Sequence, residues 1–176
     1  PPNKKYRGKT YAEWSAEHWK WLYSLPIDHH PLLDTAECSA GQSGSVWFLG
    51  GTFTSTTEGN VTVGRATRDC TVPHGKALFF PIMDTECSTI EGNGATDADL
   101  RGCAKFFQDH AYNMTCTIDG IEVQNLDDFR VQSPLFTFGP LPDNNILQSF
   151  GYAAPKGATS PSVSDGVFVM LAPLPA

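Results

Sequence analysis

The sequence is poor in positive charge and has no long apolar run. Its 176 residues include 12 Lys and Arg against 19 Asp and Glu, which gives a formal charge of −7. Nucleic-acid binding needs clustered positive charge to neutralise phosphates, so this composition argues against a nucleic-acid partner. No stretch approaches the roughly 20 apolar residues of a membrane-spanning helix, so no membrane span is expected.

Familiar catalytic motifs are also lacking: there is no GxSxG, HExxH or glycine-rich phosphate loop. The nearest approach is GQSGS at 41–45. It is expected to enter a strand, whereas a nucleophile elbow leaves a strand for a helix. We therefore predict no catalytic residues. A metal-dependent hydrolase using the histidines and acidic residues is the least favoured alternative.

The five cysteines show no CxxC spacing, so neither a zinc ribbon nor a thioredoxin-type site is expected. Cysteines in an acidic chain with 13 Pro and 16 Gly, and hence many turns, fit an oxidising compartment. Because the chain starts at Pro1 without Met, we expect that a signal peptide has been removed and that the protein is secreted.

Four cysteines are predicted to form two disulfides, Cys38–Cys70 and Cys87–Cys103. The first would close a loop of about 32 residues, worth roughly 3–4 kcal/mol in the chain-entropy model. The second would tie an acidic loop to a predicted helix. Cys116 is left over as a buried thiol, or it pairs with Cys103 and leaves Cys87 free.

Short apolar runs rich in β-branched and aromatic residues predict a fold that is α+β but mainly β. Three of them, 46–49, 61–66 and 77–82, lie between Cys38 and Pro81, which we take as the centre of an antiparallel, jelly-roll-like β-sandwich. Residues 45–53 and 61–72 are expected to pair around a hairpin tip at 54–59. Later strands are expected at 129–132, 135–138 and 167–171, with 139–162 mostly loop.

Two helices are predicted to pack on the sandwich. Thr10 and Glu13 form a capping box, so a helix should run to about Ser24. A second helix should start at Thr96 or Asp97 and end near residue 112, with one apolar face formed by Leu100, Cys103, Ala104, Phe107 and Ala111. Asp-Gly at 119–120 between apolar runs predicts a tight hairpin. Residues 1–9 are expected to be an arm and a candidate donor strand, and 10–176 a single domain.

Several residues are candidate sites. Asn60 and Asn113 begin glycosylation sequons. The predicted loop 84–99 is acidic, and hard oxygen ligands of this kind suit calcium, although the spacing is not that of an EF-hand. No other cofactor is expected. The residues concerned are Asp84, Glu86, Glu91 and Asp97.

Aromatic and histidine residues give weaker signals. An aromatic stripe on the first helix is either a sugar platform or, more simply, packing against the sheet. The candidate platform residues are Trp14 and Trp21, which share one face of the helix, and Trp19, which points elsewhere. His29 and His30 are adjacent, as metal ligands can be, but a metal site would need further ligands from elsewhere.

The chain resembles a group of uncharacterised secreted bacterial proteins over most of its length. The segments that carry the likeness are GKTYAEWSAEHWKW, HPLLD, CSAGQSGSVWFLGGTF, CTVPHGKALFFPI, IDGIEVQNL, RVQSPLFTF and DGVFVMLAPLP. The resemblance implies a secreted, β-rich domain and brings no activity. The chain is also similar to subunits of glycan-coated extracellular fibrils, a likeness that no single motif carries.

Members of that group continue beyond the LAPLP-like segment, with a Gly-x-His-x-Ile-type strand and one more. Without those strands a sheet edge would stay open, and an open edge is a template for another chain. The arm at 1–9 of a neighbour could fill it, and repeated head-to-tail contact makes a filament. We therefore expect a glycosylated structural subunit that forms a homo-oligomer or filament. The alternative is a carbohydrate-binding module.

Overall fold

The computed structural model describes residues 2–28, 30–33, 38–52, 55–58, 61–64 and 67–173, with backbone only for 55–58 and 61–64. Its helices are α1 (Tyr11–Tyr23), α2 (Asp97–Asp109), the short α3 (Ile146–Ser149) and a 3-10 turn, η1 (Leu126–Phe129). Its strands are β1 (Val46–Phe48), β2 (Ser55–Glu58), β3 (Val61–Gly64), β4 (Ala77–Ser88), β5 (Thr117–Ile118), β6 (Ile121–Glu122), β7 (Arg130–Gln132), β8 (Phe136–Phe138) and β9 (Ser160–Leu171).

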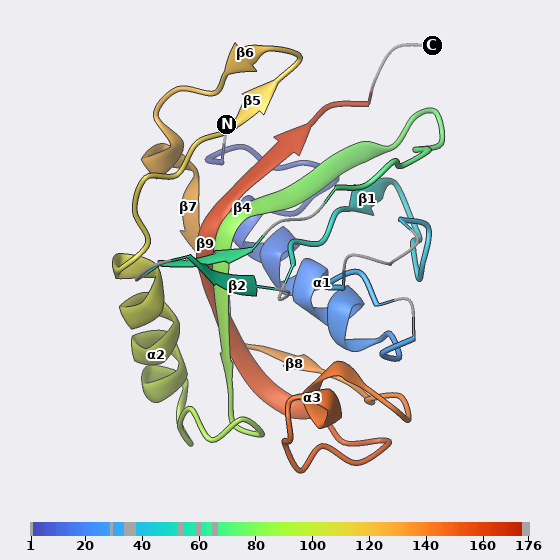
Figure 1. Cartoon of the computed structure of the whole chain (residues 1–176), viewed down its shortest axis with the longest axis vertical. Coiled ribbons are helices and arrows are strands. Elements are labelled where there is room, and N and C mark those ends of the chain that lie inside the picture. The colour runs from blue at the N-terminus through green and yellow to red at the C-terminus, as the bar shows by residue number, and fades with distance from the viewer. Residues whose placement is uncertain are drawn as a thin grey trace.

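The main sheet has five strands and is curled like a half-barrel (Figure 1). Its order is β1-β4-β9-β7, and β8 pairs with the other end of β9. The long strands β4 and β9 run antiparallel from Leu78 to Ser88, with a bulge between Pro81 and Met83, and β1 runs parallel to β4. A bulge of this kind bends a strand and increases its twist, which fits the curl.

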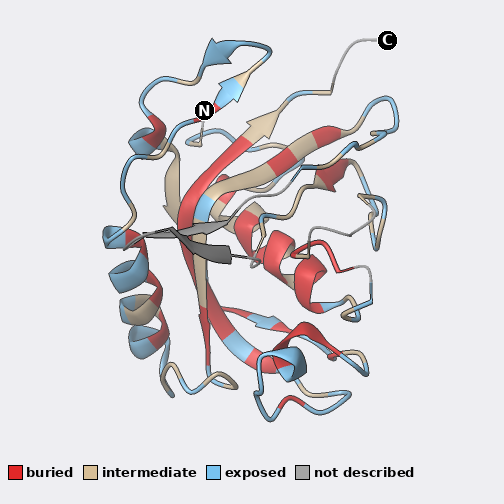
Figure 2. Ribbon diagram, in the orientation of Figure 1, coloured by how far each residue is buried: buried red, intermediate tan, exposed pale blue. Residues whose placement is uncertain are grey.

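Strand β9 is the centre of the fold, because both of its faces are covered. Even-numbered residues such as Ser164 and Phe168 face α1, where Ser164 bonds to Ser15 and Phe168 stacks on Phe79 at 5.1 Å between ring centroids. Odd-numbered residues such as Val163 pack with α2 or with the segment that carries β5 and β6. Figure 2 shows that β9 and α1 are largely buried, whereas the outer face of α2 is exposed.

Helix α1 follows the sequence prediction closely. The Thr10 hydroxyl accepts a hydrogen bond from the Glu13 N–H, and the Glu13 carboxylate accepts one from the Thr10 N–H at 2.7 Å. His18, Trp19, Leu22 and Tyr23 are all buried, so the helix is covered on more than one side. A helix with this pattern belongs inside the molecule rather than on its surface.

Helix α2 also begins at its predicted cap, Thr96. Leu100 and Ala104 are buried beside the Cys87–Cys103 disulfide, whose Cα atoms lie 6.1 Å apart. The predicted apolar face is wrong at Phe107, whose ring is 55% exposed. The other expected disulfide, Cys38–Cys70, is also present, and Cys116 is a buried free thiol.

Several strand predictions need correction. Strand β1 does not form a hairpin with β3; it joins β4, and β3 pairs with β2 across the place expected to be a loop tip. Strand β4 extends well beyond the apolar run 77–82, and β9 begins well before the predicted 167–171. The jelly-roll-like sandwich is not confirmed, because helices rather than a second large sheet cover the faces of β9 among the described residues. The Asp119-Gly120 hairpin is confirmed, with positive φ at both residues.

Candidate functional site

The most distinctive feature of the sheet is an edge of β4 that is only partly paired. Strand β1 covers β4 from Ala77 to Phe79, and the next hydrogen bond in the same direction joins the Leu49 N–H to the Phe79 carbonyl. Beyond this point, no described strand pairs with β4 on the side opposite β9. Within the described part of the chain, β4 beyond Phe79 is therefore an open edge, which we follow from Phe80 to Glu86.

The direction of each backbone group on this edge follows from the ladder. In antiparallel pairing, alternate residues bond to the partner strand and the residues between them point away. Ala77 and Phe79 point towards β1, and the bulge shifts this set so that Asp84, Glu86 and Ser88 point outward. Asn93 satisfies Ser88 by accepting its N–H at 3.0 Å and donating to its carbonyl at 3.2 Å.

Asp84 and Glu86 are different. Their outward N–H and carbonyl groups have no backbone partner among the described residues. Pro81 fits the same interpretation, because proline in a sheet is confined to edges, strand starts and bulges. Backbone groups left without a partner are what a further strand needs for docking.

A cleft of about 350 Å³ lies along this edge. Asp84, Thr85 and Glu86 form its floor, and Glu91 follows in the loop after β4. Its remaining lining comes from α1, α2 and the loop after α3: Trp19, Tyr23, Phe107, Phe150 and Tyr152. The cleft thus combines an open edge, three carboxyl groups and five aromatic rings.

Three of these rings are large and exposed, in contrast to the buried aromatic core. Phe107 is 55%, Phe150 49% and Tyr152 37% exposed. They come from segments far apart in the sequence, yet they meet at one opening. Exposed apolar groups gathered at one place, rather than scattered singly, mark interaction sites.

A hydrogen-bond network holds the carboxyl groups. The Tyr23 hydroxyl donates to Glu86 at 2.5 Å, and the Ser162 hydroxyl donates to the other Glu86 oxygen. The Ser88 hydroxyl donates to Glu91 at 2.6 Å. One Asp84 oxygen is buried and lacks a hydrogen-bond partner among the described residues.

This environment disfavours negative charge. Burial raises the pKa of Asp84 to about 7, and the indole N–H of Trp19 offsets only part of that effect. Burial and the neighbouring Glu91 raise the pKa of Glu86 well above its usual value. Burial and the nearby Glu86 likewise raise the pKa of Tyr23. A cation at this place would favour the charged carboxylates and reverse the shifts.

The calcium prediction gains no support. Asp84 and Glu86 lie in strand β4 rather than in a loop, and Asp97 starts α2, where it pairs with Arg101 at 2.9 Å. In the described part of the chain, no three His, Cys, Asp or Glu side chains come together as a metal site. Asp84, Glu86 and Glu91 line one cleft, and Asp97 is not among its lining residues.

The predicted aromatic platform is wrong as an exposed surface. Trp19 and Trp21 are only 4% and 7% exposed, and half-buried Trp14 donates its indole N–H to the Tyr6 carbonyl at 3.0 Å. Lys9 lies 5.1 Å from the Trp14 ring centroid. These residues fasten α1 into the core. Of the rings exposed at the cleft, Phe107 was predicted to be part of the apolar face of the second helix, and Phe150 and Tyr152 carried no periodic signal in the sequence.

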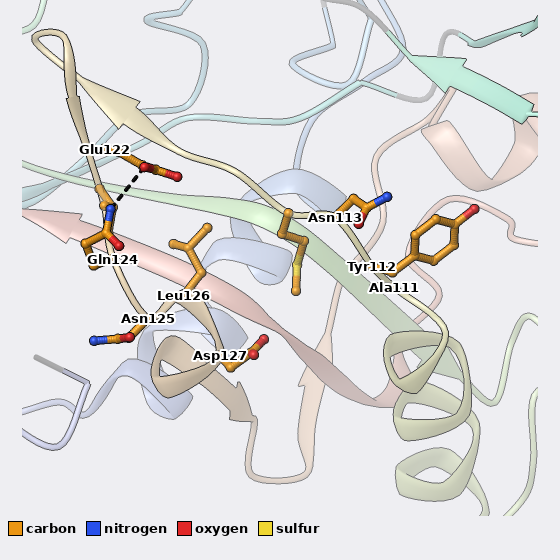
Figure 3. A pocket seen from close by; sticks show the side chains of 10 residues that line it. Ala111, Tyr112, Asn113, Glu122, Gln124, Asn125, Leu126 and Asp127 are labelled. Atoms are coloured by element: carbon orange, nitrogen blue, oxygen red, sulfur yellow. Dashed lines mark hydrogen bonds between the residues drawn. The ribbon is translucent and has the colours of Figure 1, made fainter.

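Asn113, the second sequon, is exposed on the segment after α2. It borders a hollow of about 450 Å³ between residues 111–114 and 122–127 (Figure 3). Its side chain is therefore accessible to a modifying enzyme, and its glycosylation stays a prediction. Asn60, the first sequon, lies outside the described residues.

The histidine pair does not form a metal site that can be described. His29 lies outside the described residues, and His30 is buried, with Nε2 2.9 Å from the Leu22 carbonyl. His18 is also buried, 3.0 Å from the Leu49 carbonyl, and burial lowers its pKa to about 4. Both serve packing.

None of the described helices is long and apolar enough to cross a membrane. Comparison of the chain with protein-family models, with curated proteins and with solved structures finds no match. The cleft and the open edge of β4 are therefore the features of the molecule that bear on its function.

Proposed function

We propose that this protein is a secreted, non-enzymatic structural subunit of an extracellular filament or matrix, glycosylated at its sequons and assembled by strand addition between subunits. The observation that carries the proposal is the open edge of β4 at Asp84 and Glu86, with a cleft along it. An extended segment that docks on such an edge gains main-chain hydrogen bonds, and side-chain pockets give it specificity.

Two further observations support this proposal. The two disulfides suit a protein of an oxidising compartment. The sheet is a curled half-barrel, and part of its β4 edge is unpaired among the described residues, so a donated strand would extend it. Closing an edge in this way removes its unpaired backbone groups.

The hydrogen bonds at one open edge contribute a modest free energy of association, and repeated contacts of this kind would stabilise an assembly. Asp84 and Glu86 offer two N–H and two carbonyl groups. Each hydrogen bond contributes about 0.5–1.5 kcal/mol net, so the edge alone supplies about 2–6 kcal/mol. Burial of the exposed rings would add to this.

A matched pair of substitutions tests the proposal. Asp84→Pro and Asp84→Ala both remove the carboxylate, but only Asp84→Pro removes the outward N–H. We expect Asp84→Pro to associate about 3- to 10-fold more weakly than Asp84→Ala, the effect of losing one hydrogen bond. Sedimentation velocity and negative-stain electron microscopy would measure association, and near-ultraviolet circular dichroism would check the fold. Equal association of the two folded variants would contradict the proposal.

One observation favours a second candidate, a carbohydrate-binding module. The exposed Phe107, Phe150 and Tyr152 beside polar groups resemble a sugar-binding surface in composition. Tyr152→Ala should then weaken binding on a glycan array without changing subunit association. A metal-dependent hydrolase has no such support, because the described residues hold no metal-ligand cluster.

A further inference from the structure

The cleft along β4 has the chemistry to receive a cation. Asp84, Glu86 and Glu91 line it, and among the described residues no Lys or Arg forms a salt bridge with any of them. Asp165, by contrast, pairs with Arg130 at 2.8 Å.

The walls of the cleft suit the rest of a basic side chain. Phe107, Phe150 and Tyr152 present exposed rings at the opening. The aliphatic stem of a lysine packs on such rings, and its ammonium group is attracted to their faces. The occupant that fits is therefore an extended segment with lysine beside small or apolar residues.

The N-terminal end of the chain carries Lys4 and Lys5 after Pro2 and Asn3, in a turn and bend that docking as a strand would straighten. Asn3, Lys4 and Lys5 are exposed. The segment is bounded by a turn in which Tyr6 and Lys9 exchange hydrogen bonds of 2.8 and 3.1 Å, and Trp14 fixes the Tyr6 carbonyl. The turn anchors the arm from Tyr6 onward, and the lysines project ahead of it.

The N-terminal segment and the cleft along β4 lie at different places on the molecule. In Figure 1 the N terminus is at the end of the molecule near β5, whereas α3, whose following loop borders the cleft, is at the opposite end. A contact between two unlike patches is heterologous, and unless the rotation closes it gives an open-ended assembly.

We infer that residues 2–5 of one copy dock on the open edge of β4 in the next copy, an inference that rests on the proposed function. Lys4 or Lys5 would then reach Asp84, Glu86 and Glu91. A strand alternates its side chains between faces, so one lysine faces the carboxyl groups and the other faces away. The carboxylates supply the recognition, and the backbone of Asp84 and Glu86 supplies the pairing.

A peptide-binding experiment tests this inference. A fluorescent peptide of residues 1–9 is titrated with the full chain at concentrations where sedimentation shows no self-association. We expect binding that weakens at least tenfold when Lys4 and Lys5 of the peptide are changed to Gln, and likewise for the Asp84→Asn or Glu91→Gln protein. Asp128→Asn, at an exposed carboxylate of η1, is the matched control and should leave binding unchanged.

Two results would overturn the inference: equal binding of the Gln peptide, or unchanged binding by both Asp84→Asn and Glu91→Gln. Failure here is distinguishable from failure of the proposed function. If the full chain with Lys4→Gln and Lys5→Gln still assembles while Asp84→Pro does not, the edge is an acceptor and the donor is another segment. If Asp84→Pro and Asp84→Ala assemble alike, strand addition itself fails, whatever the peptide does.

Discussion

The buried carboxyl group of Asp84 makes the stability of the protein depend on pH. Its pKa rises from 3.8 to about 7 on folding, so the folded state holds the proton more tightly than the unfolded chain does. The stability that results is fully present below about pH 4 and is lost as pH rises through about 7. Glu86 and Tyr23, beside it in the cleft, have raised pKa values and therefore act in the same direction.

The size of this effect can be worked out from the pKa. Each pKa unit corresponds to about 1.4 kcal/mol, which sets an upper limit of about 4 kcal/mol for Asp84. Asp84 borders an open cleft, where water shields part of the charge, so we expect about 1–3 kcal/mol. Asp84→Asn removes the titration and keeps the shape.

Urea unfolding of wild type and Asp84→Asn at pH values from 4.5 to 8.5 would measure it. The wild type should lose about 1–3 kcal/mol relative to Asp84→Asn across this range. Taking the difference cancels His18, whose lowered pKa gives the opposite slope at acidic pH. Parallel pH profiles for the two proteins would refute the account of a desolvated Asp84.

Other predictions concern the frame around the cleft. Gly166→Ala should cost about 1–3 kcal/mol, because the new Cβ would lie 2.9 Å from a β4 carbonyl; Gly102→Ala, in open space on α2, should instead stabilise by about 0.5–1 kcal/mol in thermal melts. Thr10→Ala should cost about 1 kcal/mol by chemical denaturation, and a near-zero change would contradict the capping box. Changing Cys87 and Cys103 together to Ser should cost about 2–4 kcal/mol, and an unchanged denaturation midpoint would show that the bridge contributes nothing.

The features that the sequence predicted well are local ones. The capping box of Thr10 and Glu13 and the Asp119-Gly120 turn are each decided by residues within a few positions of one another. Such features need no knowledge of distant partners. The disulfides Cys38–Cys70 and Cys87–Cys103 were also predicted, although the sequence left a pairing of Cys103 with Cys116 open.

The features that failed depend on pairing across the chain. Strand β1 pairs with β4 rather than with β3, which is nearer to it in sequence. Local β-propensity cannot predict which strand becomes the partner. The first half of β9 has the polar residues Ser160, Ser162 and Ser164, yet all three are buried. Their hydroxyls are satisfied within the protein: Ser160 accepts from the Ile90 N–H at 3.0 Å, Ser162 donates to Glu86 and Ser164 donates to Ser15. The cleft was missed for the same reason, since its rings come from three separate segments.

Amide hydrogen exchange at Asp84 and Glu86 tests strand addition most directly. Exchange would be compared between dispersed subunits and assembled material, with residue resolution. The account predicts that both amides exchange rapidly when dispersed and become protected on assembly, while the already paired Thr85 changes little. If Asp84 and Glu86 exchange equally fast in the assembled material, no strand has joined this edge and the central claim is wrong.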